Sequence, residues 1–111
     1  KKKEIPMKFE FVESSLFTKA VKELLPDDEY LQLQQHLMLY PEDGNVVRGS
    51  GGVRKLRWSR PGTGKSSGVR VCYYVLDEFD QIWMLVIYPK SVADSIPGHI
   101  LRQLKEELLD E

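Results

Sequence analysis

The sequence has little of what would mark a secreted or membrane protein. Cys72 is the only cysteine among 111 residues, so no internal disulfide can form, and its apolar surroundings predict a packing role in a reducing cytosol. No apolar run approaches the roughly 20 residues that span a bilayer, and no apolar segment follows the N-terminal lysines as it would in a signal peptide. We therefore expect a cytoplasmic protein that neither enters a membrane nor is secreted.

Internal repeats and low-complexity segments are also missing, which favours a single globular domain. With 41% hydrophobic residues, the chain can bury a modest core. Residues 1–6 are expected to be a disordered extension or an addition made in cloning, with Met7 as the native start. Residues 7–111 then form the domain.

Acidic side chains are absent from the central third of the chain. Residues 44–76 contain no Asp or Glu, although the net charge of the whole protein is −1. Their basic residues are Arg48, Arg54, Lys55, Arg57, Arg60, Lys65 and Arg70. Such segregation predicts a surface that contacts a polyanion, with nucleic acid first and a membrane surface second. The alternative is a solvated hairpin that happens to lack carboxylates.

The stretch RPGTGKSSGVR, residues 60–70, contains GTGKS, which is similar to the end of a phosphate-binding loop. The full motif needs a glycine five positions before Gly64 and a helix after the loop. Ser59 stands at that position, and a strand-like run follows the loop. The sequence therefore predicts a flexible basic loop and no nucleotide cofactor.

Metal ligands at suitable spacing are missing as well. His36 and His99 fall on separate predicted helices, and no cysteine or carboxylate lies at a spacing that suggests a metal site. Both are expected to be ordinary histidines on helix surfaces.

Hydrophobic periodicity predicts the element order β, α, α, β, β, β, α. Met7, Phe9 and Phe11 alternate as in a first strand. Helices are expected at 15–25 with Ser14 or Ser15 as the cap, at 28–40 with Asp27 and Asp28 as caps, and at 95–111; strands are expected at 53–59, 69–77 and 81–88, with a tight turn over 77–80. The strand at 81–88 is apolar on both faces and should be central. We expect an α+β domain whose small sheet is mostly antiparallel, with an N-terminal αα-hairpin on one face and a C-terminal helix.

Strand alternation groups three of the basic residues. If Leu56 and Trp58 face the core, Lys55 and Arg57 lie on the opposite face of the sheet. A hairpin to the next strand would place Arg70 across from them. Three such cations repel one another unless an anion binds between them. The alternative is that the three side chains extend into solvent from a solvent-exposed face of the sheet and bind nothing.

Four stretches form a pattern that covers nearly the whole chain from Met7. The stretches are MKFEFVESSLFTKAV, GNVVRGSGGVRKLRWS, SGVRVCYYVLD and IWMLVIYPKS, and the second predicted helix, between the first two stretches, ends in YP. This pattern resembles the RelE superfamily of bacterial type II toxins, most closely its HigB-like branch. The resemblance implies an endoribonuclease that cleaves messenger RNA on the translating ribosome, in the A site, without a metal. It also implies a cognate, HigA-like antitoxin encoded beside the toxin.

The resemblance further implies roles for individual residues. Lys55 and Arg57 match the basic pair on the family's second strand, and Arg70 matches the arginine at the start of its third. They would stabilise the phosphorane that forms when a ribose 2′-OH attacks the neighbouring phosphate. Lys55 is the first candidate for general base, because neighbouring cations favour the neutral form of a lysine. Some members carry a tyrosine and an arginine after the last strand; here Tyr88 is the candidate to stack or assist, and Lys90 to supply charge.

Basic residues outside this group are expected to grip phosphates of messenger and ribosomal RNA. These candidates are Arg48, Arg54, Arg60 and Lys65. Two other readings stay open. ParE-like toxins share the fold and poison DNA gyrase through protein contacts, which would not require three cations on one face. A noncatalytic RNA-binding protein would need only the basic face.

Overall fold

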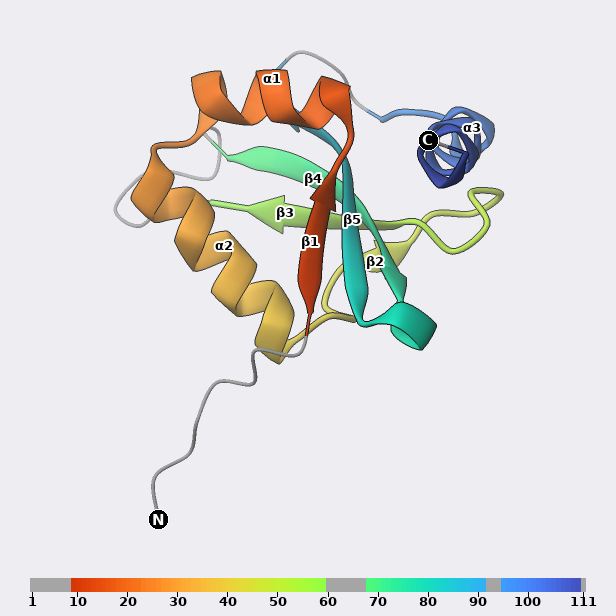
Figure 1. The fold of residues 1–111 in the computed structure, drawn as a ribbon. Coiled ribbons are helices and arrows are strands. Elements are labelled where there is room, and N and C mark those ends of the chain that lie inside the picture. The colour runs from red at the N-terminus through yellow and green to blue at the C-terminus, as the bar shows by residue number, and fades with distance from the viewer. Residues whose placement is uncertain (1–8, 60–67, 92–94, 111) are drawn as a thin grey trace.

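The chain folds as an α+β domain, in which helices cover both faces of one mixed sheet (Figure 1). The computed structural model describes residues 9–59, 68–91 and 95–110. The elements are β1 (Glu10–Glu13), α1 (Ser15–Leu24), α2 (Asp27–Leu39), β2 (Asn45–Val46), β3 (Arg54–Trp58), β4 (Val69–Leu76), β5 (Gln81–Pro89) and α3 (Gly98–Leu109). None of these helices is both long and apolar enough to span a membrane.

The sheet has the order β1-β5-β4-β3-β2. Strand β1 pairs in parallel with β5, and the other neighbours are antiparallel, so the mostly antiparallel sheet is confirmed. Strand β5 lies between β1 and β4, which explains why both of its faces are apolar. The middle position belongs to β4. A bulge interrupts the β4–β5 pairing, because Cys72 pairs with Val86 while Tyr73 pairs with Met84, leaving Leu85 unpaired.

Helices α1 and α2 cover one face of the sheet, where Phe17, Leu33 and Leu37 are fully buried against it. Ser14 caps α1 as predicted, because its Oγ accepts a hydrogen bond from the Phe17 N–H at 3.0 Å. The same Oγ donates to the Leu85 carbonyl oxygen at 2.7 Å, which joins the start of α1 to the bulged strand.

Three details differ from the sequence prediction. The N-cap of α2 is Pro26, without a side-chain hydrogen bond, whereas Asp27 and Asp28 lie inside the first turn. Their negative charges still interact favourably with the positive, N-terminal end of the helix dipole. The local charge pattern therefore indicated the start of α2, although the predicted cap residues were wrong. Strand β1 begins at Glu10, one residue after Phe9, whereas Met7 lies outside the described residues. Strand β2 was missed, because two exposed residues leave no periodic pattern.

Helix α3 covers part of the opposite face (Figure 1). Leu101 and Leu108 pack there with Val53 and Trp83, and with the buried Cys72, which confirms the packing role of the thiol. Helix α3 also contacts the loop between β2 and β3, since Lys105 Nζ donates to the Gly51 carbonyl oxygen at 2.8 Å. The remainder of this face carries Lys55 and Arg57 of β3 and Arg70 of β4.

Candidate functional site

A row of polar side chains crosses three neighbouring strands. Arg70 on β4 pairs directly with Arg57 on β3 and with Tyr88 on β5. Paired residues share a face, and Tyr88 packs in the cluster under α3, so the row lies on the α3 side of the sheet. Lys55 pairs with Cys72 on the same face. The sequence therefore correctly predicted that Lys55, Arg57 and Arg70 share one face.

The end of this row borders a hollow of about 210 Å³ that is rich in positive charge. It is lined by Arg57, Ser59, Arg70 and Lys90. Arg70 is only 9% exposed, whereas Arg57 and Lys90 reach solvent. The Lys90 N–H donates to the Gly68 carbonyl oxygen at 3.3 Å, which keeps the end of β5 beside the start of β4. A half-enclosed site with three cations and a hydroxyl has the chemistry of an anion site and the size for a phosphate group.

Lys55 lies in an adjoining hollow of about 300 Å³ and not in the first one. That second hollow is lined by Asp43, Asn45, Lys55, Leu56 and Arg57. Arg57 lines both hollows and therefore lies at the boundary between them. Asp43, Asn45 and Ser59 were not singled out from the sequence. Asn45 pairs with Lys55 across β2 and β3, and only this long-range pairing brings it to the site.

Tyr88 and Cys72 form a buried pair beside Arg70. Tyr88 is 7% exposed, and apart from weak contact with the Cys72 thiol its hydroxyl has no hydrogen-bond partner among the described residues. Burial raises the pKa of the Tyr88 hydroxyl, and the positive charge of Arg70 partly opposes this effect. Burial likewise raises the pKa of the Cys72 thiol, to about 11, against the opposing charge of Lys55. Both groups are therefore protonated at neutral pH, and Tyr88 can donate but not accept a proton.

The remaining predicted contact residues lie elsewhere. Arg54 lies on the face opposite Lys55, together with Leu56 and Trp58, as strand alternation requires. Arg48 is exposed in the loop beside the start of α3, where its carbonyl oxygen would be only 2.0 Å from a Cβ at Gly98. Arg60 and Lys65 lie outside the described residues.

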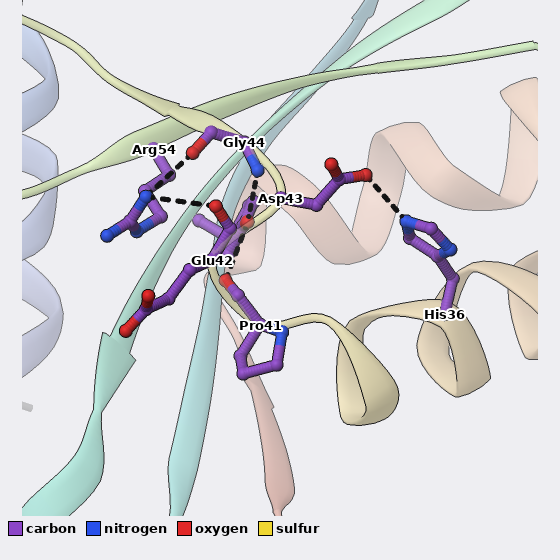
Figure 2. Close-up of polar contacts among 7 residues, drawn as sticks. His36, Pro41, Glu42, Asp43, Gly44 and Arg54 are labelled. Carbon is purple, nitrogen blue, oxygen red and sulfur yellow. Dashed lines mark hydrogen bonds and ion pairs between the residues drawn. The ribbon is translucent and has the colours of Figure 1, made fainter.

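A turn over residues 41–44 carries Asp43 to the second hollow, and the sheet fastens this turn at several points (Figure 2). Arg54 Nη1 donates to the carbonyl oxygens of Glu42 and Gly44 at 3.1 and 2.8 Å. The buried Tyr73 hydroxyl donates to the Pro41 carbonyl oxygen at 2.8 Å and accepts from the Gly44 N–H at 2.9 Å. The turn is therefore held by side chains of both β3 and β4.

His36 on α2 contacts the carboxylate of this turn. Its Nε2 lies 2.7 Å from Asp43 Oδ2, and its ring packs between those of Tyr40 and Trp58, with centroids 5.3 and 5.4 Å away. The sequence predicted an ordinary surface histidine, and the Asp43 contact adds a specific partner. No group of three or more His, Cys, Asp or Glu side chains within the described ranges is arranged to hold a metal ion.

Comparison with known proteins identifies the fold. No family model matches the chain. Among similar solved structures, a mutant of the E. coli toxin RelE in the free state has a TM-score of 0.57 at 17% identity, over 94% of this chain and 97% of that one. The crystal structure of the archaeal RelE–RelB complex from Pyrococcus horikoshii OT3 has a TM-score of 0.50 at 24% identity, over 78% of this chain and 100% of that one. This protein therefore has the RelE-like fold, as the sequence predicted.

Proposed function

We propose that this protein is the toxin of a type II toxin–antitoxin system and an endoribonuclease that cleaves messenger RNA in the ribosomal A site, thereby inhibiting translation. The observation that carries the proposal is the hollow lined by Arg57, Arg70 and Lys90, which gathers three cations on a RelE-like sheet. The fold supports the toxin class. Assignment to the HigB-like branch rests on the sequence motifs.

The hollow suits the phosphate at which an RNA chain is cut. When the ribose 2′-oxygen bonds to the neighbouring phosphorus, the five-coordinate phosphorane carries additional negative charge before the 5′-oxygen leaves. Arg57 and Arg70 present forked donors to that charge, and Lys90 adds a third cation. The products are a 2′,3′-cyclic phosphate and a 5′-OH. In this proposal the three cations supply the positive charge that a metal ion supplies in other nucleases.

Lys55 and Tyr88 flank the phosphate hollow. Lys55 lines the adjoining hollow, which shares Arg57 with the phosphate hollow, and its proposed part is in moving protons. Tyr88 pairs with Arg70 on the neighbouring strand, and its protonated hydroxyl makes it a hydrogen-bond donor or a stacking surface. The sequence prediction that these residues assist catalysis is thus kept as part of the proposal.

The proposed partners are the ribosome with its messenger and ribosomal RNA, in the cytoplasm, and a HigA-like antitoxin. The archaeal neighbour was crystallised as a RelE–RelB complex, which supports a protein partner for this fold. Arg48, Arg60 and Lys65 remain the candidates for gripping RNA phosphates at a distance from the cut. Arg54 has a further task, because it holds the turn over residues 41–44.

Expression of the protein without an antitoxin tests this proposal. Protein synthesis should stop before DNA supercoiling changes, and messenger RNA from the arrested cells should show new cuts within codons. Loss of gyrase activity with intact messenger RNA would instead establish a ParE-like function. Arrest of translation with intact messenger RNA would establish a noncatalytic RNA-binding function.

A further inference from the structure

A carboxylate shares a hollow with two of the cations that are proposed to face the RNA. Asp43 lines the second hollow together with Lys55 and Arg57, and Arg57 connects that hollow to the phosphate site. A negative charge at this position repels a polyanion and weakens its binding. A carboxylate in the hollow that adjoins the phosphate site is therefore unfavourable for binding alone, which suggests a part in the chemistry.

The position of this carboxylate is fixed from two directions (Figure 2). Arg54 and Tyr73 hold the backbone of the turn on both sides of Asp43. His36 holds the side chain, with its Nε2 at 2.7 Å from Oδ2. Asp43 Oδ1 has no hydrogen-bond partner within the described part of the chain. One carboxylate oxygen is thus oriented by the protein, and in the proposal below the other one faces the substrate.

Stability alone does not account for the contact between His36 and Asp43. The two side chains are 29% and 48% exposed, and exposed ion pairs contribute only about 0 to 1 kcal/mol. The turn already has hydrogen bonds from Arg54 and Tyr73 that hold it without His36. The specific effect of His36 is to set the direction of the carboxylate.

We propose that Asp43 is the general base of the cleavage reaction and that His36 is a positioning residue for it. This inference rests on the proposed endoribonuclease function. Aspartates are ionised at neutral pH, whereas lysines are protonated unless their surroundings disfavour the charge, so a carboxylate is the readier proton acceptor. Lys55 then has the opposite role from the one that the sequence suggested.

Asp43 and Lys55 together account for both proton transfers of the cleavage step. Asp43 takes the proton of the ribose 2′-OH while the 2′-oxygen forms its bond to phosphorus. The bond from phosphorus to the 5′-oxygen then breaks, and that oxygen takes a proton from the Lys55 ammonium group. Arg57 and Arg70 stabilise the phosphorane between the two proton transfers. Exchange with water restores both residues after the products leave.

The test uses the full chain and ribosomes programmed with a defined messenger RNA, and measures single-turnover cleavage at saturating protein together with ribosome binding. Asp43→Asn keeps an oxygen acceptor for His36, so the turn should stay folded. We expect its cleavage rate constant to fall by about 100-fold or more, the usual effect of losing a general base, while binding is unchanged or tighter. Asp43→Glu should retain more activity than Asp43→Asn.

Two further variants separate chemistry from structure. Glu42→Gln removes a carboxylate from the same turn. Glu42 shares a hollow with Tyr40, Pro41 and Asp43 but does not line the hollow of Lys55 and Arg57, so this variant should cleave within about twofold of wild type. His36→Phe keeps a ring between Tyr40 and Trp58 but removes the hydrogen bond to Asp43. It should lower the rate constant and not binding, and it should have no additional effect when Asp43 is already Asn.

Each outcome has a definite meaning. Wild-type cleavage with equal cleavage by Asp43→Asn would overturn the general-base assignment and leave the proposed function intact. Weaker ribosome binding by Asp43→Asn would also overturn the general-base assignment. So would cleavage by Asp43→Asn at different bases with an undiminished rate constant, because Asp43 would then recognise a base. A wild-type protein that binds ribosomes without cutting RNA would overturn the proposed function and this assignment together.

Discussion

Replacing Arg70 by alanine should be the most damaging single change at the phosphate hollow. Arg70 lies between Arg57 and Tyr88 in the sheet and is only 9% exposed, so its guanidinium group is held in a partly dehydrated position. Charges interact more strongly where water is displaced. A fixed donor of this kind typically contributes about 3 to 4 kcal/mol to the transition state, which corresponds to roughly 100-fold to 1000-fold in rate.

The fold should survive this substitution. Arg70 on β4 pairs directly with Arg57 on the neighbouring strand β3, and like charges at paired positions destabilise a sheet. Removing one of them relieves repulsion, while losing the apolar stem of the side chain removes packing. These effects oppose each other, so we expect the free energy of unfolding to change by no more than about 1 kcal/mol. Arg70→Lys should lie between wild type and alanine in activity, because a lysine keeps the charge and loses the fork.

The assay is single-turnover cleavage of ribosome-bound messenger RNA, with thermal unfolding measured in parallel. Arg102→Ala is the matched control, since Arg102 is an exposed arginine on α3 that forms an ion pair with Glu106 of the same helix, with 3.5 Å between Nε and Oε2. It should cleave like wild type. Full cleavage and toxicity of Arg70→Ala, combined with loss of both in Tyr88 or Lys90 variants, would refute the placement of the transition-state charge beside Arg70.

Other measurements test the remaining features. Tyr73→Phe should lower the free energy of unfolding in urea by about 1 to 3 kcal/mol, because two backbone partners in the turn lose their hydrogen bonds, whereas Tyr40→Phe on the exposed helix end should change it little. A thiol whose pKa is raised by folding stabilises the fold while protonated, so stability should decline as the pH rises toward about 11, and less steeply in Cys72→Ala. Arg60→Ala combined with Lys65→Ala should weaken ribosome binding and lower its salt dependence by about one unit of log–log slope per lost contact, and saturable ATP binding would contradict the rejection of a nucleotide site. Chelators should leave wild-type cleavage unchanged, with cyclic phosphate ends on the products; a requirement for added metal would refute the proposed chemistry.

Much of the fold could be predicted because its determinants are local. Ser14 caps α1 through a hydrogen bond to a residue three positions away, which a sequence pattern can indicate. The two-residue period of a strand is strict, so Leu56 facing the core was enough to place Lys55 and Arg57 on the other face. Arg70 followed from joining two consecutive strands as a hairpin. The α2 cap failed because several residues around Pro26 satisfy the same local preference.

The sequence by itself determined the elements other than β2, the segregation of charge and the face on which the central cations lie. Tertiary structure decided which side chains join them. Ser59 and Lys90 meet Arg70 because the ends of β3 and β5 flank the start of β4, and Asp43 reaches Lys55 because β2 adds itself to β3. Such neighbours arise from the register between strands and from hydrogen bonds that close long loops. No periodicity within a single segment encodes those contacts, because their free energy is realised only when the whole sheet is assembled.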